Sequence, residues 1–244
     1  MALHAPPARG ARLGRAAGAR TGSGSTESAV NGVVLLLPGA SRFSPGPMRP
    51  LARALARAGG AEGLVTHTVI HGGDSAREEQ ARWAADEVVR RYGDVPVCLA
   101  GYDAGGLAAL RAAGHGAVNS VVAMAPCLTP GTRADSPEPV KQLSGRQVLI
   151  VHGTDDARSD PESSFRLAAR AKKANRATCR FEVHSDGHGL REHQPEVVAL
   201  AVDFVLGAMF SGRYSRPVTD ALAAPPPLGL RMPLASGFGR SLRK

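Results

Sequence analysis

The feature that most constrains this chain is a series of short apolar runs that alternate with segments of helical periodicity. The runs cover residues 32–37, 64–70, 95–100, 120–125, 147–151 and 179–183. The helical segments cover residues 48–58, 75–92, 104–113, 160–174 and 195–209. Near-continuous apolar runs are typical of strands that are covered on both faces. The alternation therefore predicts an α/β fold, with a doubly wound, mostly parallel sheet of about six strands between two helical layers.

Two of the expected helices begin with recognisable capping signals. Ser75 and Glu78 have the spacing of a capping box, in which the hydroxyl and the carboxylate each bind a free backbone amide. Asp160 precedes Pro161, which predicts an aspartate N-cap followed by proline in the first helical position. These signals predict helix starts near residues 75 and 160.

The charge is unevenly distributed along the chain. The net charge is +9, but residues 31–210 contribute only +1, with 20 basic and 19 acidic side chains. We therefore expect a disordered basic N-terminal tail at 1–30, a folded domain at 31–210, and an extended basic Pro/Gly-rich C-terminal tail at 211–244. Because the predicted domain is almost neutral, no specific contact with nucleic acid is expected.

Several features limit the compartment and the partners of this protein. No apolar run approaches the roughly 20 residues that span a bilayer, so membrane insertion is not expected. The N-terminus has no continuous apolar segment of the secretory type. Cys98, Cys127 and Cys179 lack metal-ligand spacing, which favours reduced thiols in a cytoplasmic protein. Without a glycine-rich nucleotide motif, no cofactor is implied, and a small-molecule substrate is expected.

Polar residues follow three of the predicted strands. They form the segments Gly101–Gly106, His152–Asp156 and Ser185–Gly189. In an open parallel sheet, ligands bind beyond the carboxyl ends of the strands, so these segments can form one site. We interpret His152 as a packing residue at the end of its strand.

The segment from Gly101 to Gly106 has the features of a sharp turn between a strand and a helix. Such a turn brings backbone segments so close that side chains at positions 101 and 105 would clash. It exposes the side chain of Asp103 and directs the amide of Ala104 toward whatever that side chain attacks. The sequence therefore predicts a reactive carboxylate at position 103.

The order of these three motifs resembles that of the α/β-hydrolase family, over about residues 31–210. The resemblance implies Asp103 in the nucleophile position and His188 as the general base. It implies Asp156, four residues after His152, as the acid that orients the base, with Asp155 as the fallback. The turn Pro38-Gly39-Ala40 matches the oxyanion loop, so the amides of Ala40 and Ala104 would form the oxyanion hole. Only about 20 residues separate the strands ending near 125 and beginning near 147, which implies a form without a cap domain.

The aspartate at the turn departs from the serine of most members and resembles epoxide hydrolases and haloalkane dehalogenases. An aspartate is already ionised at neutral pH and needs no base to attack a saturated carbon. The expected enzyme is a hydrolase with an Asp-His-Asp triad and a covalent ester intermediate, which His188 resolves by deprotonating water. Candidates for contact with the substrate, or for proton donation, are Tyr102, Arg42 and His71.

Other interpretations remain open at this point. The protein could be a carboxylester hydrolase of serine-hydrolase descent in which Asp103 positions water. It could also be a non-catalytic binding protein in which Asp103 caps the following helix. His184 or His193 could replace His188 as the base. A metal site of His184, Asp186, His188 and His193 matches no strong ligand spacing, so no metal is expected.

Overall fold

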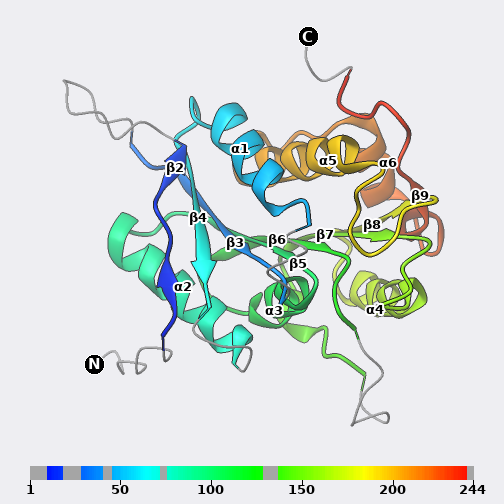
Figure 1. Ribbon diagram of the computed structural model, residues 1–244, viewed down its shortest axis with the longest axis horizontal. Coiled ribbons are helices and arrows are strands. Elements are labelled where there is room, and N and C mark those ends of the chain that lie inside the picture. The colour runs from blue at the N-terminus through cyan, green and yellow to red at the C-terminus, as the bar shows by residue number, and fades with distance from the viewer. Residues whose placement is uncertain (1–9, 19–28, 41–45, 72–75, 129–136, 241–244) are drawn as a thin grey trace.

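The computed structural model describes residues 10–18, 29–40, 46–71, 76–128 and 137–240, which form a three-layer α/β fold (Figure 1). In this part of the chain, six parallel strands make up most of the sheet. They are β3 (Gly32–Leu37), β4 (Leu64–Ile70), β5 (Val97–Tyr102), β6 (Val118–Met124), β7 (Gln147–Gly153) and β8 (Thr178–Val183). Their order is β4-β3-β5-β6-β7-β8. The predicted fold class is therefore confirmed.

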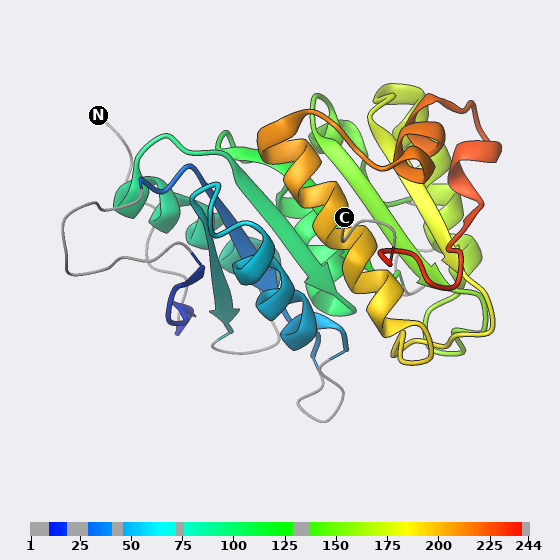
Figure 2. The same ribbon diagram turned by 90° about the horizontal axis from the view of Figure 1, so that it is seen from above.

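Helices cover both faces of this sheet (Figures 1 and 2). One face carries α1 (Met48–Ala58), α5 (Gln194–Leu206) and α6 (Arg216–Ala223), and the other carries α2 (Arg77–Tyr92), α3 (Ala104–Ala112) and α4 (Pro161–Ala174). Side chains of a strand alternate between the two faces. In β3, Val34 and Leu36 pack in the core under α1 and α5, while Leu35 packs in the core under α2 and α3. Both faces are buried, as the apolar runs predict.

One of the two predicted helix caps is confirmed. The carboxylate of Asp160 accepts a hydrogen bond of 2.9 Å from the amide of Glu162 at the start of α4. Helix α2 begins at Arg77, and Ser75 of the predicted capping box lies outside the described residues. The aspartate cap therefore fixes the start of α4 as expected.

Both ends of the chain extend the sheet, which corrects the predicted tails. Strands β1 (Arg12–Leu13) and β2 (Ala17–Gly18) pair antiparallel with β4, although a disordered tail is expected there. At the other end, α6 is followed by a short helix at Leu228–Leu230 and by β9 (Met232–Pro233), which pairs parallel with β8. The expected extended tail is therefore wrong for this segment, while residues 1–9, 19–28 and 241–244 lie outside the described residues.

Two buried basic side chains explain why the C-terminal segment is held. Lys172 donates from Nζ to the carbonyl oxygens of Ala221 and Leu222 at 2.7 and 3.1 Å. Arg180, which is fully buried, donates from Nη1 to the carbonyl oxygen of Leu230 at 2.9 Å. Buried cations require such partners, so these contacts tie the segment to α4 and β8.

Within the described residues, the helical stretch Gln194–Ser211 is long and apolar enough to cross a membrane by length and composition alone. Its inner face contacts the sheet through Val197, Ala201 and Phe204, which are fully buried. Core helices of globular proteins share this composition.

The strand order changes direction between β3 and β5, inside the sheet. From β3 the chain moves to β4 on one side, and then returns to place β5 on the other side of β3. The loops that follow β3 and β5 therefore leave the sheet side by side and in opposite directions. This is the switch point at which α/β folds bind ligands.

Candidate active site

Asp103 lies in a strained turn between β5 and α3. Its φ and ψ are 56° and −124°, an unfavourable conformation for any residue other than glycine. The surrounding backbone enforces it, because the amide of Asp103 donates to the carbonyl oxygen of Met124 at 3.0 Å. Its own carbonyl accepts from the amide of Gly106 at 3.0 Å. The turn therefore presents the carboxylate in a fixed direction.

Glycines at three positions make this turn possible. A Cβ at Gly101 would lie 2.1 Å from the carbonyl oxygen of Gly105, and one at Gly105 would lie 2.0 Å from that of Leu37. The predicted clash at both positions is therefore confirmed. A Cβ at Gly39 would lie 2.8 Å from Oδ2 of Asp103, a close approach that the sequence did not reveal.

Two backbone amides converge on the Asp103 carboxylate. The amide of Ala40, after β3, donates to Oδ2 over 3.2 Å, and the amide of Ala104 is close enough to help lower the pKa of this carboxylate. Burial alone would raise the pKa of Asp103, but His188 and these amides hold it below its ordinary value. The amides that the resemblance assigns to an oxyanion hole are thus engaged by Asp103 itself.

His188 lies between two carboxylates. Its Nδ1 is 2.7 Å from Oδ2 of Asp156, and its Nε2 is 3.3 Å from Oδ1 of Asp103. Burial alone would lower the pKa of His188, but Asp103 and Asp156 raise it to about 9. Both carboxylates therefore favour the imidazolium form of His188, and the three predicted triad residues lie together.

Asp156 is held by more groups than His188 alone. Its side chain is fully buried, and Oδ1 accepts from the amides of Arg158 and Ser159 at 2.8 and 3.0 Å. Burial would raise the pKa of Asp156, but its hydrogen bonds to two histidines and these amides hold it well below its ordinary value. Asp155 is exposed and accepts from Thr154, so the structure favours Asp156 over this fallback.

His152 is the residue whose place in the site the sequence did not reveal. Instead of merely packing, this fully buried side chain places Nε2 3.0 Å from Oδ2 of Asp156. Its Nδ1 lies 2.9 Å from Oγ of Ser164, and that hydroxyl accepts from Nε of Arg180 at 3.0 Å. The four-residue spacing between His152 and Asp156 was the only available signal.

The three candidates for substrate contact or proton donation have different surroundings. Tyr102 is buried, and its ring centroid lies 5.4 Å from that of His188. His71, after β4, has Nδ1 2.6 Å from Oε1 of Gln80 on α2. Arg42 lies outside the described residues. Of the two described candidates, the structure shows Tyr102 in contact with the triad.

The other histidines near the site have different surroundings. His184 is exposed, and the amide of His193 donates to Asp186 at 3.0 Å, as does that of Arg191 at 3.1 Å. Asp186 thus shapes the loop that carries His188. Over the described ranges, no three His, Cys, Asp or Glu side chains form a group that could hold a metal ion.

Comparison with known proteins supports the fold. No family model matches the sequence, and no curated protein is significantly similar to it. Among solved structures, Est1E from Butyrivibrio proteoclasticus has a TM-score of 0.58 at 15% identity, over 74% of this chain and 88% of that one. The Pyrococcus furiosus esterase Pf2001 has a TM-score of 0.60 at 15% identity, over 73% and 84%.

A third solved structure shares the same fold. XC6422 from Xanthomonas campestris, described as an α/β serine hydrolase without a lid, has a TM-score of 0.56 at 14% identity, over 78% of this chain and 86% of that one. These similarities establish the α/β-hydrolase fold for this chain. The residue at the turn between β5 and α3, called here the elbow, is nevertheless an aspartate.

Proposed function

We propose that this protein is a hydrolase that forms a covalent ester between Asp103 and a small substrate with a reactive saturated carbon, such as an epoxide or an alkyl halide. One observation carries the proposal: the two oxygens of the Asp103 carboxylate face different partners. Oδ2 accepts from the amide of Ala40, while Oδ1 faces Nε2 of His188. This division matches the two steps of such a reaction.

In the first step, Oδ1 of Asp103 attacks the saturated carbon and the leaving group departs with its electron pair. Oδ2 stays in the amide pocket and becomes the carbonyl oxygen of the new ester. An ester substrate would need the amides of Ala40 and Ala104 for its own carbonyl oxygen. Oδ2 of Asp103 already engages these amides. The resting geometry therefore favours displacement at carbon over acyl transfer.

In the second step, water adds to Cγ of Asp103 while neutral His188 takes its proton. The amides of Ala40 and Ala104 stabilise the negative charge that develops on Oδ2. Cleavage of the bond between Cγ and Oδ1 then releases the product alcohol and restores the carboxylate. Asp156 stabilises the imidazolium that forms in this step.

The protonation of His188 fits both steps. In the resting site the imidazolium can give its Nε2 proton to the alkoxide of an opened epoxide, so no separate acid is required. Esterification removes the charge of Asp103, and the pKa of His188 falls because one of its two carboxylate partners is lost. A neutral base is then available for the hydrolytic step.

The test is a single turnover of excess enzyme with styrene oxide in ¹⁸O-labelled water. Mass spectrometry of the Asp103 peptide should show one ¹⁸O, because the water oxygen remains in the carboxylate. With an alkyl bromide, whose leaving group needs no acid, His188→Ala should accumulate an adduct with the mass of the alkyl group, and Asp103→Asn should not. Asp155→Asn, which changes the neighbouring exposed carboxylate, is the matched control. Turnover of epoxides and alkyl halides without label or adduct at Asp103 would refute the proposal.

A second candidate is a carboxylester hydrolase in which Asp103 positions water. It is favoured by the esterases among the structural neighbours. This candidate predicts hydrolysis of p-nitrophenyl acetate that survives Asp103→Asn and is lost in His188→Ala. Absence of turnover with esters, epoxides and halides would instead favour a binding protein, whose Asp103 only stabilises the turn.

A further inference from the structure

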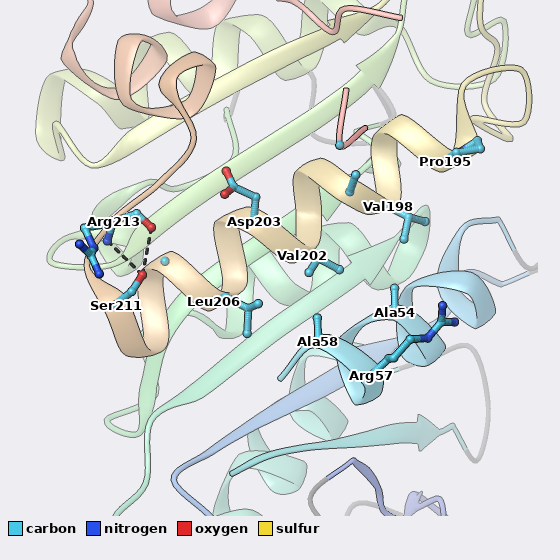
Figure 3. A pocket seen from close by; sticks show the side chains of 13 residues that line it. Ala54, Arg57, Ala58, Pro195, Val198, Val202, Asp203, Leu206, Ser211 and Arg213 are labelled. Atoms are coloured by element: carbon cyan, nitrogen blue, oxygen red, sulfur yellow. Dashed lines mark hydrogen bonds between the residues drawn. The ribbon is translucent and has the colours of Figure 1, made fainter. Parts of the chain in front are cut away.

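A cavity of about 590 Å³ lies between α1 and α5, outside the triad and its hydrogen-bond partners (Figure 3). This volume is within the range of small-molecule sites. Its lining combines the second half of α1, most of α5 and Gly239 near the C-terminus. None of the residues discussed for catalysis contributes to it.

The floor of this cavity, called here the α1–α5 groove, is apolar. Val198, Val202 and Leu206 lie four residues apart on α5, and their side chains face Ala54 and Ala58 of α1 (Figure 3). The alanines are too short to fill the space beside the branched side chains. The row on α5 is about 12 Å long at 1.5 Å per residue. It therefore offers a narrow apolar track rather than a round pocket.

The rim of the groove is positively charged. Arg57 lines it, and Arg49 and Arg53 follow the same exposed side of α1 at four-residue intervals. Helix α1 contains no acidic residue, and in the described part of the chain none of these arginines has an ion-pair partner. Such a field attracts anions.

Two further charged residues line the α1–α5 groove at α5 and beyond. Both carboxylate oxygens of Asp203 accept from the amide of Ser215, at 3.1 and 3.2 Å, so this carboxylate is already engaged. Arg213 lies at the far end of the groove (Figure 3). Arginines thus flank the apolar track toward both of its ends.

We propose that the α1–α5 groove binds a single-chain amphipathic anion of the fatty-acid type. The alkyl chain lies along Val198, Val202 and Leu206, where it covers apolar surface that α1 leaves open. The carboxylate lies at the rim and pairs with Arg57. We assign an unesterified anion, because Arg49, Arg53 and Arg57 would have no role toward a neutral apolar ligand.

The test is calorimetric titration of the full chain with sodium dodecanoate below its micelle concentration. Saturable one-to-one binding is expected. Ala58→Leu, at an exposed position, fills the groove and should abolish it, as should Ala54→Leu. Arg57→Gln should weaken binding about fivefold, the effect of losing one exposed ion pair. Arg90→Gln, on α2, is the matched control and should bind as the parent does.

Two further arms separate the groove from other binders. Dodecyltrimethylammonium, a cation with the same chain length, should bind at least about fivefold more weakly than dodecanoate. Asp103→Asn should bind dodecanoate unchanged, which excludes the triad as the site. The proposal is overturned if binding is not saturable, if Ala58→Leu and Ala54→Leu bind as the parent does, or if the cation binds equally.

Discussion

The amide of Ala40 donates to Oδ2 of Asp103 over 3.2 Å, so the carboxylate at the elbow engages the backbone donors beside it. These donors come from two loops, one after β3 and one at the start of α3. A shorter side chain at position 103 would leave them open to a substrate oxygen. The choice of residue at this one position therefore decides which oxygen the amides stabilise.

Replacement of Asp103 by serine should convert the site toward acyl transfer. In Asp103→Ser the amides of Ala40 and Ala104 are freed, and His188 loses one carboxylate partner and becomes a better base at neutral pH. Hydrolysis of p-nitrophenyl acetate should rise at least about tenfold over the parent. The measurement is initial-rate absorbance at pH 7.5.

The double variant Asp103→Ser with His188→Ala is the control and should lose the gained activity. If the single variant folds, as judged by circular dichroism, yet gains nothing over the parent, the two amides do not act as an oxyanion pocket.

The titration of His188 should depend on Asp103. In the parent the pKa of His188 is raised to about 9. Asp103→Asn removes one of the two carboxylates, so the pKa of His188 should fall by about one unit or more. Nitrogen-detected NMR of ¹⁵N-histidine-labelled protein from pH 5 to 10 measures this directly. An unchanged titration in Asp103→Asn would show that Asp156 alone sets the pKa.

The same shift predicts how stability varies with pH. The pKa of His188 rises from 6.5 in the unfolded chain to about 9 in the fold. Its contribution is therefore complete below pH 6.5 and is lost as the pH rises through 9. The free energy of unfolding should fall by about 2 to 3 kcal/mol from this group between pH 6.5 and 9.5.

Asp103 and Asp156 act with the opposite sign. Their pKa values are lowered in the fold, so their contribution is present above about pH 4 and is lost at lower pH. Urea denaturation at a series of pH values measures both the loss of stability at alkaline pH and the loss at acidic pH. The alkaline decline should flatten in His188→Gln, and an equal decline in that variant would assign the pH dependence to other groups.

His152 should contribute to stability through its hydrogen bond to Asp156. His152→Phe removes the donor from a buried carboxylate and should lower the free energy of unfolding by about 1 to 3 kcal/mol. His152→Gln retains a donor and should lose less. Urea denaturation at pH 7 compares the two variants. Equal losses would show that shape, rather than the hydrogen bond, determines the effect.

The elbow should not tolerate a single added methyl group. Gly105→Ala places Cβ against the carbonyl oxygen of Leu37, and we expect a loss of about 3 kcal/mol or more in the free energy of unfolding. Gly116→Ala is the matched control, since no atom lies within 4 Å of its added Cβ. Thermal melts of the two variants provide the comparison, and similar melting temperatures would contradict the close packing at the elbow.

The strands, the main helices and the grouping of Asp103, His188 and Asp156 could be predicted from the sequence. Apolar runs and helical periodicity are local signals, and parallel strands bring their following loops to one edge of the sheet. The glycines at 101 and 105 mark the turn for the same local reason.

The rest depends on contacts between distant segments. His152 binds Asp156, but its other partner, Ser164, is supplied by α4, whose position cannot be inferred from the sequence around His152. Lys172 and Arg180 look like surface residues in the sequence, yet both are buried by the segment that follows α5. That segment docks through its backbone carbonyl oxygens. Because every residue has a carbonyl oxygen, no sequence pattern predicts this docking.

The short strands at the margins of the sheet affect how separate molecules behave toward one another. An open margin presents unpaired amides and carbonyls to any other strand that arrives. Here β1 and β2 lie along the outer side of β4, and β9 lies along the outer side of β8. Each terminal segment therefore covers an edge strand of the sheet, with which a neighbouring copy could otherwise pair. Loss of the first 18 residues would leave β4 as an unpaired edge strand and promote aggregation.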